Sequence, residues 1–282
     1  MGDSVVSGSG RRSGRGRDAA GGAGTSALTI WASRLFIAVV LIYLFAPVVV
    51  TVLFSFTTSP RLSLPIEGVT LDWYRKAFAD PLFTTALNNS LVLAVVTAVV
   101  SVTLGVTFSF GMARLSARTR GPLLTASLLP AAVPALVLGV ALAVFFTALN
   151  RPPGLVNAAI GHILVALPFV ILTLNARLET FDFSVTEAAR DLGASPLRTF
   201  RDITFPIMRP SVIGAALLAM ALSIDEFVVT WFTIGNQQTL PVLIWGLLRR
   251  GIDPTVNALA TVVLVSLVFL VVLSSLLSRR RS

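Results

Sequence analysis

Apolar residues occur along the chain in long uninterrupted runs, without the period-two alternation of half-buried strands. Each run has about twenty residues or more, the length that crosses a hydrocarbon core of about 30 Å as an α-helix. The absence of alternation excludes a membrane β-barrel. The pattern therefore predicts an all-α, polytopic membrane protein with six transmembrane helices, at residues 31–54, 87–113, 122–149, 155–176, 207–234 and 256–277.

Several prolines fall inside these predicted helices, at Pro47, Pro130, Pro134 and Pro168. Proline removes a backbone donor and kinks a helix. Since the stretch Leu128–Gly139 contains two prolines four residues apart, we expect the third helix to be bent. Such a bend is consistent with a helix that lines a polar path and equally with one that has only a packing role.

The charge of the chain is unusual for a soluble protein, because only 12% of its residues are charged whereas the net charge is +9. Basic residues on the cytoplasmic side of a membrane protein explain this charge better than a nucleic-acid partner does. With six helices, both termini share one side, which collects 16 Lys and Arg residues against six on the other. We therefore predict cytoplasmic termini, and an external loop at Gly68–Phe78 with a short amphipathic helix.

The N-terminal residues 1–26 are rich in Gly, Ser, Ala and Arg. A segment of this composition cannot bury enough apolar surface to become ordered, so we expect a disordered basic tail. It resembles the start of a signal peptide, but the apolar run that follows is too long and lacks a small-residue cleavage site. We therefore predict an uncleaved first span and one membrane domain over residues 27–282.

One polar stretch, EAARDLGASPLRTFRDITFP, stands between the fourth and fifth predicted spans. Ser184 followed three residues later by Glu187 matches the capping-box pattern, which predicts that a helix begins here. Gly193 suits the left-handed position that ends such a helix.

A second short helix is predicted directly after this glycine. Ser195 followed by Pro196 reads as a helix cap with proline at the first helical position. The helix would occupy residues 197–204, and Pro206 would stop it before the fifth span.

Helices this short are marginal on their own in water and need a surface to pack on. Ala188, Ala189 and Leu192 give the first helix a small apolar face. The face could lie in the groove of a partner protein, a common mode of recognition. It could equally pack on helix ends of the same chain, and the residues alone leave both alternatives open.

The loop has a characteristic spacing, formed by Glu187, Ala188, Ala189, Gly193, Ile203, Phe205 and Pro206. This spacing resembles the EAA loop of the integral membrane subunits of binding-protein-dependent ABC importers. Phe205 stands where that family usually has Leu, which exchanges one apolar residue for another. Three further stretches resemble the PotC-type permeases of spermidine/putrescine importers, at Leu53–Ser59, Ala221–Gly235 and Thr239–Thr261. Permeases for iron(III), thiosulfate and aminophosphonates have related sequences and remain alternatives.

The resemblance implies a type I ABC importer permease fold in the bacterial cytoplasmic membrane, moving a polyamine by alternating access. It implies three protein partners: a cytoplasmic ATPase dimer, a second homologous permease subunit and an extracytoplasmic solute-binding protein. It also implies that the loop 184–206 docks on the ATPase. The expected ATPase-coupling residues are Glu187, Ala188, Ala189, Arg190, Asp191, Leu192, Gly193, Ala194, Ser195, Pro196, Leu197 and Phe200.

Two adjacent acidic residues, Asp225 and Glu226, fall inside the predicted fifth span. Acidic side chains inside a membrane are energetically costly and usually face a polar interior. The two residues are therefore candidates for lining the translocation path of a cation. A hydrogen bond that only helps the helices to pack explains either residue equally well. Since adjacent residues point about 100° apart on a helix, we expect one in the path and one at an interface. Trp231 and Tyr43 could stack on a cation, but interfacial anchoring is the commoner role of such residues.

Catalysis by this chain is not indicated. His162 is the only histidine and there is no cysteine, so a zinc site with three or four protein ligands cannot form, and we expect no metal, no cofactor and no catalytic residues. The only lysine, Lys76, is not in a phosphate-binding loop, so ATP would bind another chain. The alternatives are a secondary transporter with its ion site at Asp225 or Glu226, which no evident inverted repeat supports, and a membrane protein that does not transport.

Overall fold

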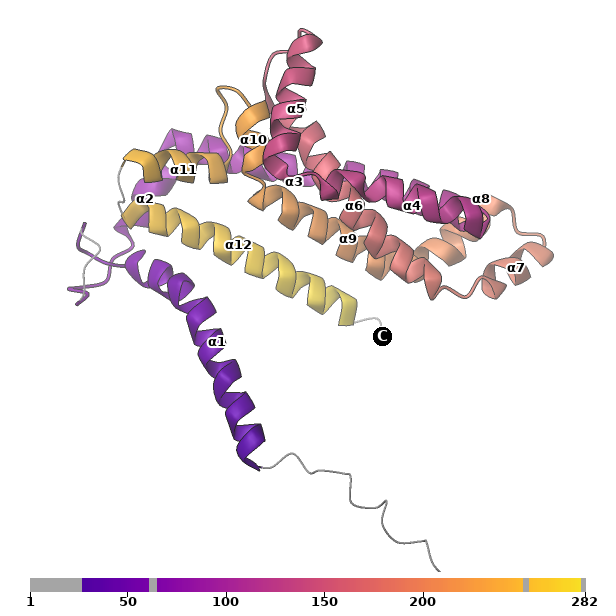
Figure 1. The fold of residues 1–282 in the computed structure, drawn as a ribbon, viewed down its shortest axis with the longest axis horizontal. Coiled ribbons are helices and arrows are strands. Elements are labelled where there is room, and N and C mark those ends of the chain that lie inside the picture. Colours follow the sequence, from indigo (N-terminus) through magenta and orange to yellow (C-terminus); the bar gives the residue numbers. More distant parts are fainter. Residues whose placement is uncertain (1–26, 61–64, 251–253, 280–282) are drawn as a thin grey trace, which may run out of the picture. The chain divides into compact units, whose positions relative to one another are not determined.

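The computed structural model describes residues 27–60, 65–250 and 254–279, and in these residues the ordered elements are helices apart from one isolated bridge between Thr57 and Val69 (Figure 1). Contacts divide the chain into one unit up to Val50 and one from Thr51, which are described separately. The elements are α1 (Ala27–Phe54), α2 (Asp72–Ala79), α3 (Pro81–Ala113), α4 (Ala117–Ala132), α5 (Ala135–Ala148), α6 (Leu155–Glu179), α7 (Ser184–Asp191), α8 (Pro196–Thr199), the π-helix η1 (Phe200–Thr204), α9 (Phe205–Asp225), α10 (Val228–Thr233), α11 (Leu240–Arg250) and α12 (Pro254–Arg279).

The first unit contains most of α1, an apolar helix of 28 residues with Pro47 in its interior. A helix of this length extends about 42 Å, more than the thickness of a hydrocarbon core. It confirms the first predicted span. The predicted disordered tail, residues 1–26, lies outside the described residues.

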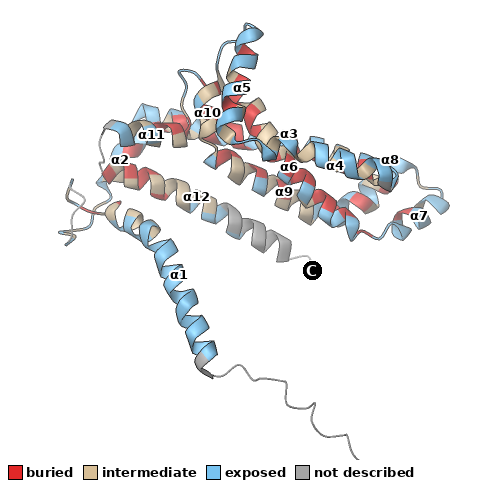
Figure 2. Ribbon diagram, viewed as in Figure 1, coloured by how far each residue is buried: buried red, intermediate tan, exposed pale blue. Residues whose placement is uncertain are grey.

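The second unit is built around α3, α6 and α9, which pack against one another along most of their length (Figure 2). Most side chains on their buried faces are small or aliphatic, so the helices approach closely, as is typical of membrane bundles. The buried cluster between them includes Ala98, Ala166, Val170, Leu174, Met208, Ala215 and Ala219. α12 packs on α9 and α2, while α2 confirms the short helix predicted within Gly68–Phe78.

Four of the helices in the described residues are long and apolar enough to cross a membrane: α1, α3, α6 and the helix running from Pro196 to Asp225. The pair α4 and α5 makes a fifth span if the two count as one. α12 supplies 26 helical residues at the position of the sixth predicted span. Its part Pro254–Phe269 is apolar but shorter than a full span. The all-α, polytopic fold is therefore confirmed.

The predicted bend in the third span is confirmed, and it is sharp enough to divide the span into two helices. α4 and α5 meet at an angle of 92° across Val133 and Pro134. Pro134 has no N–H to continue the ladder of α4, and it forces the preceding Val133 into an extended conformation (φ −80°, ψ 128°). The second of the two prolines is therefore the cause of the break.

The prediction of one continuous fifth span over residues 207–234 was wrong. α9 ends at Asp225, Glu226 is extended (φ −71°, ψ 105°), and the short helix α10 begins at Val228. A run of apolar residues indicates that a segment lies within the membrane. It does not indicate where the backbone hydrogen bonds of the helix are interrupted. The break leaves both acidic residues next to a helix end, where polar groups can be satisfied.

Pro206 does not stop the helix that begins at Pro196, and this prediction was also wrong. The helix changes to π geometry over Phe200–Thr204, with the N–H of Phe205 bonded to the carbonyl of Phe200, and then continues as α9. The wider π turn accommodates a proline that lacks a donor and would clash with the carbonyl four residues earlier. The second short helix is thus a direct extension of the fifth span.

Candidate functional site

The polar loop forms a corner between α7 and α8, as the sequence predicted. Gly193 has φ +87°, a conformation that side chains with a Cβ rarely adopt. Its N–H donates to the carbonyl of Arg190 at 2.8 Å, and the N–H of Ala194 donates to the carbonyl of Ala189 at 3.0 Å. The predicted glycine turn is therefore confirmed.

The two helix starts differ in how well the sequence predicted them. Ser195 caps α8, since its Oγ accepts from the N–H of Arg198 at 3.4 Å. The prediction of a capping box at Ser184 was wrong. Ser184 already lies inside α7, and the residue at the cap position, Phe183, makes no side-chain hydrogen bond there. Asp182 supplies the acceptor instead, its Oδ1 bonding the N–H of Ser184 at 3.0 Å. Hydrogen bonds from the Ser184 side chain and backbone lower the pKa of the Asp182 carboxyl.

The corner exposes two large apolar side chains that no other described part of the chain covers. Leu192 is 90% exposed and Leu197 is 76% exposed, on either side of the glycine turn. Thr186 on α7 and Thr199 on α8 are buried and attach the corner to the rest of the unit. The structure thus holds the corner in place while leaving its apolar residues uncovered, which is the arrangement of a docking element.

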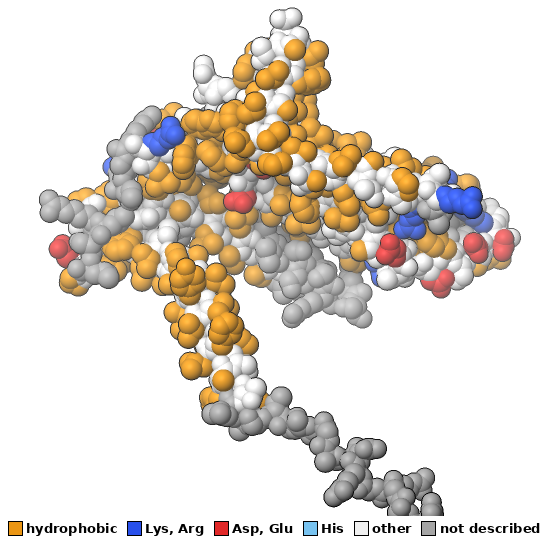
Figure 3. Space-filling view, viewed as in Figure 1, with side chains coloured by type: hydrophobic (Ala, Val, Ile, Leu, Met, Phe, Trp, Pro, Cys, Tyr) orange, Lys and Arg blue, Asp and Glu red, His pale blue; other side chains and the backbone are white. Residues whose placement is uncertain are grey.

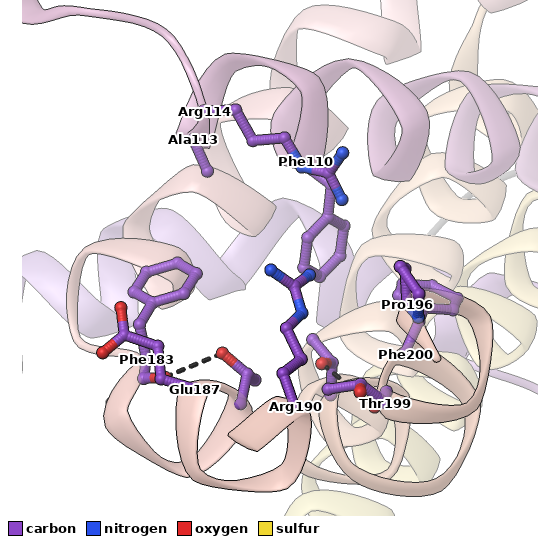
Figure 4. Close-up of a pocket in the computed structure, with 11 residues that line it drawn as sticks. Phe110, Ala113, Arg114, Phe183, Glu187, Arg190, Pro196, Thr199 and Phe200 are labelled. Carbon is purple, nitrogen blue, oxygen red and sulfur yellow. Dashed lines mark hydrogen bonds between the residues drawn. The ribbon is translucent and has the colours of Figure 1, made fainter. Parts of the chain in front are cut away.

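A groove of about 290 Å³ runs between α7, the α8–η1 segment and the end of α3 (Figure 4). Its walls carry Glu187, Arg190 and Arg114, and both guanidinium groups are directed into the groove. Phe110 and Phe200 close one side with their rings edge to face at 5.3 Å between centroids. The sequence did not predict a role for Arg114, because only the fold brings the end of α3 to the loop.

The two acidic path candidates have different environments at the break after α9. Asp225 is the last residue of α9 and is exposed. Glu226 is half-buried and lies just before α10. Its side-chain Oε1 accepts a hydrogen bond from the N–H of Val229, in the first turn of that helix, at 2.9 Å. In Figure 3 an acidic patch interrupts the hydrophobic surface close to the end of α9. The two side chains therefore have different surroundings, while the expectation of one acid in the path and one at an interface stays a prediction.

Trp231 lies on α10 away from both acids. It is 44% exposed and borders a hollow of about 460 Å³, which is lined also by Ile234, Gly235, Asn236, Gln237, Gln238 and Val242. Its ring packs against Phe227 at 5.8 Å between centroids, and Phe227 packs in turn on Trp245 at 5.5 Å. Asp225 and Glu226 do not line this hollow. Tyr43 lies on α1, in the other unit.

His162 is packed in the interior of the second unit. Only 2% of it is exposed, and its two ring nitrogens are hydrogen-bonded to the hydroxyls of Ser223 and Thr230. In the part of the chain that the structure describes, no group of three or more His, Cys, Asp or Glu side chains is placed to hold a metal ion.

The sequence has clear relatives. Residues 105–282 match the family described as binding-protein-dependent transport system inner membrane component. The spermidine/putrescine transport system permease protein PotC of Escherichia coli (strain K12) is 32% identical over 249 residues, which cover 88% of this chain and 94% of that protein. The putrescine transport system permease protein PotI of the same strain is 32% identical over 234 residues, covering 79% of this chain and 82% of PotI.

Solved structures agree on the fold. A bacterial ABC transporter that imports the acidic polysaccharide alginate superposes with a TM-score of 0.71 at 13% identity, covering 90% of this chain and 96% of that chain. The MetNI methionine ABC transporter gives a TM-score of 0.57 at 18% identity, covering 71% and 96%. The fold is therefore that of a type I ABC importer permease. Together with the corner and its spacing, these matches mean that the chain belongs to the inner membrane component family of binding-protein-dependent transport systems.

Proposed function

We propose that this chain is one of two permease subunits of an ATP-driven importer and that its substrate is a polyamine such as spermidine or putrescine. The observation that carries the coupling role is the pair of exposed leucines, Leu192 and Leu197, at the glycine corner. The names of the PotC and PotI relatives support the substrate class. Residues 27–282 then form the permease domain, which supplies half of the path.

The corner is the proposed contact with a cytoplasmic ATPase. Transferring two exposed leucines from water to a protein groove favours association, by roughly 1.5–3 kcal/mol for each fully buried side chain. The adjacent guanidinium groups of Arg190 and Arg114 add charge that an acidic partner surface would complement. Because α8 continues into α9, a displacement of the corner is transmitted directly to the helix that ends at Asp225.

Alternating access follows from this connection. ATP closes two ATPase subunits, and their motion shifts the permease between inward-open and outward-open states. A ligand biases such an equilibrium only by contacts that differ between the states, and the corner is where those contacts are proposed to form. An external solute-binding protein would deliver the polyamine on the opposite side, and a second homologous permease would complete the path.

The proposed orientation puts both termini and the corner in the cytoplasm. Arginines gather at the corner end of the second unit, on the ends of α3 and α6, at the start of α4 and within the loop: Arg114, Arg118, Arg120, Arg177, Arg190, Arg198 and Arg201. The cytoplasmic side of a membrane protein carries such an excess of basic residues. The α2 end would then face the exterior of the bacterial cytoplasmic membrane.

Asp225 is the proposed contact for the cationic substrate. It is exposed, whereas Glu226 is engaged by the N-terminus of α10. A carboxylate in a membrane-embedded break attracts an ammonium group strongly, because the surroundings screen charge less than water does.

Single-cysteine cross-linking tests the coupling role, and it is direct because the chain has no cysteine. Leu192→Cys gives one thiol at the corner, and Leu71→Cys gives a matched exposed thiol beside α2 at the other end of the unit. In intact membranes we expect a short bifunctional reagent to join position 192, but not 71, to a protein that mass spectrometry identifies as a Walker-A ATPase. Cross-links to such an ATPase from both positions or from neither would contradict the proposal.

A further inference from the structure

The single histidine joins three helices at the break between α9 and α10. His162 comes from α6, and its Nδ1 lies 2.7 Å from the Oγ of Ser223, two residues before the end of α9. Its Nε2 lies 2.7 Å from the Oγ1 of Thr230 on α10. The imidazole therefore bridges the break that separates Asp225 from α10.

The same part of α6 holds α10 in close contact. Gly161 has no side chain at the point where α10 crosses, and a Cβ placed there would lie 2.5 Å from the Cγ1 of Val229. Real Cβ atoms do not come this close to another heavy atom, so the glycine is required for the approach that brings Thr230 within reach of the ring.

Hydrogen bonds continue from the ring to the acidic residue. The Oγ1 of Thr230 donates to the carbonyl of Glu226 at 2.7 Å, while the Oε1 of Glu226 accepts from the N–H of Val229 at 2.9 Å. The backbone and the side chain of Glu226 are thus both bonded to the first turn of α10. A contact that holds the Thr230 side chain in place therefore also restricts the position of Glu226.

This geometry determines where the ring carries its proton. The one hydroxyl proton of Thr230 is given to the Glu226 carbonyl, which can only accept, so Oγ1 must accept from Nε2–H. In a neutral imidazole Nδ1 is then the acceptor. It receives the proton of Ser223 at 2.7 Å, in preference to Thr97 Oγ1, which lies 3.4 Å from the same hydroxyl. Since no described carboxylate forms an ion pair with this buried ring, the neutral form is the one that its surroundings favour.

We propose that His162 is a positioning residue for the path: as the neutral Nε2–H tautomer it ties α10 to the end of α9, and so fixes Glu226 and Trp231 relative to Asp225. The bonding role rests on the geometry alone. Its consequence for transport rests on the proposed function, so the two are tested by separate measurements.

The tautomer can be read in the wild-type protein, because a ¹⁵N-histidine label places signal on one residue only. The full chain, purified with a histidine-free tag and returned to lipid bilayers, should give one protonated and one unprotonated ring nitrogen at pH 7 in solid-state NMR, with the proton on Nε2. A proton on Nδ1 alone, or on both nitrogens, would overturn the assignment.

Substitution then tests the tie itself through hydrogen exchange in α10. His162→Leu removes the two bonds that join the ring to Ser223 and Thr230, so α10 loses its tie to α6 and α9, and the amides of residues 228–233 should exchange about tenfold faster. His162→Gln can accept from Ser223 with Oε1 and donate to Thr230 with Nε2, so it should restore most of the protection. The matched control is Asn175→Leu, a buried polar residue of α6 whose amide bonds only the carbonyl of Ile171 on its own helix.

The outcomes are distinct. Unchanged exchange in His162→Leu, or equal acceleration in Asn175→Leu, would overturn the positioning role. If exchange responds as expected, uptake by the complete importer should show a higher KM for spermidine in His162→Leu and a KM near wild type in His162→Gln. If the wild-type complex shows no ATP-driven polyamine uptake, the proposed function fails while the exchange result still supports the tie.

Discussion

Asp225 and Glu226 are consecutive residues with different surroundings, because a helix ends between them. Asp225 remains exposed at the end of α9, while Glu226 satisfies a backbone donor of α10 that has no partner within its own helix. The charge proposed for the path and the hydrogen bond that fixes the start of α10 are therefore carried by neighbouring residues. Their amide variants should separate the two roles.

Asp225→Asn should raise the KM for spermidine about tenfold, since it removes the negative charge proposed to meet an ammonium group. Glu226→Gln should leave KM close to wild type, because an amide oxygen can still accept from the Val229 N–H. Initial uptake rates over a range of spermidine concentrations measure both. A KM that rises in Glu226→Gln and stays constant in Asp225→Asn would reverse the assignment.

The close contact between α6 and α10 depends on the absence of a side chain at Gly161. Gly161→Ala introduces a Cβ 2.5 Å from Val229 Cγ1, and such overpacking typically costs about 1–3 kcal/mol. We expect a lower thermal midpoint for the purified protein in detergent. Val229→Ala makes room for the new methyl group, so the double variant should be more stable than the sum of the single effects predicts.

At the scale of elements, the corner between α7 and α8 is rigid where it turns and exposed where it is proposed to bind. The turn requires positive φ at Gly193, and the continuation of α8 through η1 into α9 joins the turn to the bundle. A change that distorts the turn should therefore disturb coupling before it disturbs membrane insertion.

Gly193→Val should abolish most transport while the protein remains inserted at normal amounts, because a β-branched residue resists the left-handed conformation. Gly246→Val is the matched control, since Gly246 has no heavy atom within 4 Å of its Cβ position and no positive φ. Uptake, membrane content and ATPase copurification are measured together. Normal uptake and copurification in Gly193→Val would rule out the coupling role.

Hydropathy predicted the helices well but not the places where they break. The six apolar runs correspond to α1, α3, the α4–α5 pair, α6, α9 with α10, and α12. The gap at Glu226 and the π turn before Pro206 were missed, because both depend on how neighbouring helices satisfy freed backbone groups. Local chemistry predicted the Gly193 turn and the Ser195 cap, since each needs only adjacent residues.

The site residues that the sequence missed are those brought together across long distances in the chain. Arg114 reaches the groove beside the corner from the end of α3. His162 meets Ser223 and Thr230 at separations of 61 and 68 residues. No local pattern marks such pairs, and a single buried histidine gives no sign of its partners until the bundle is assembled.

At the scale of the whole molecule, the proposed importer has its energy source and its substrate path in different chains. This chain has no phosphate-binding loop of the Walker type, so an ATP-driven cycle must reach it through a protein contact. The alternative, a secondary transporter that uses an ion gradient, would need no such contact. The two differ in what must be present on the cytoplasmic side.

The most direct test of the account measures spermidine uptake into proteoliposomes that contain this chain with its partner permease, ATPase and binding protein. With ATP enclosed and all ion gradients collapsed by ionophores, wild type should accumulate spermidine, Gly193→Val should not, and Gly246→Val should match wild type. Accumulation that requires an ion gradient and proceeds without ATP would contradict the account.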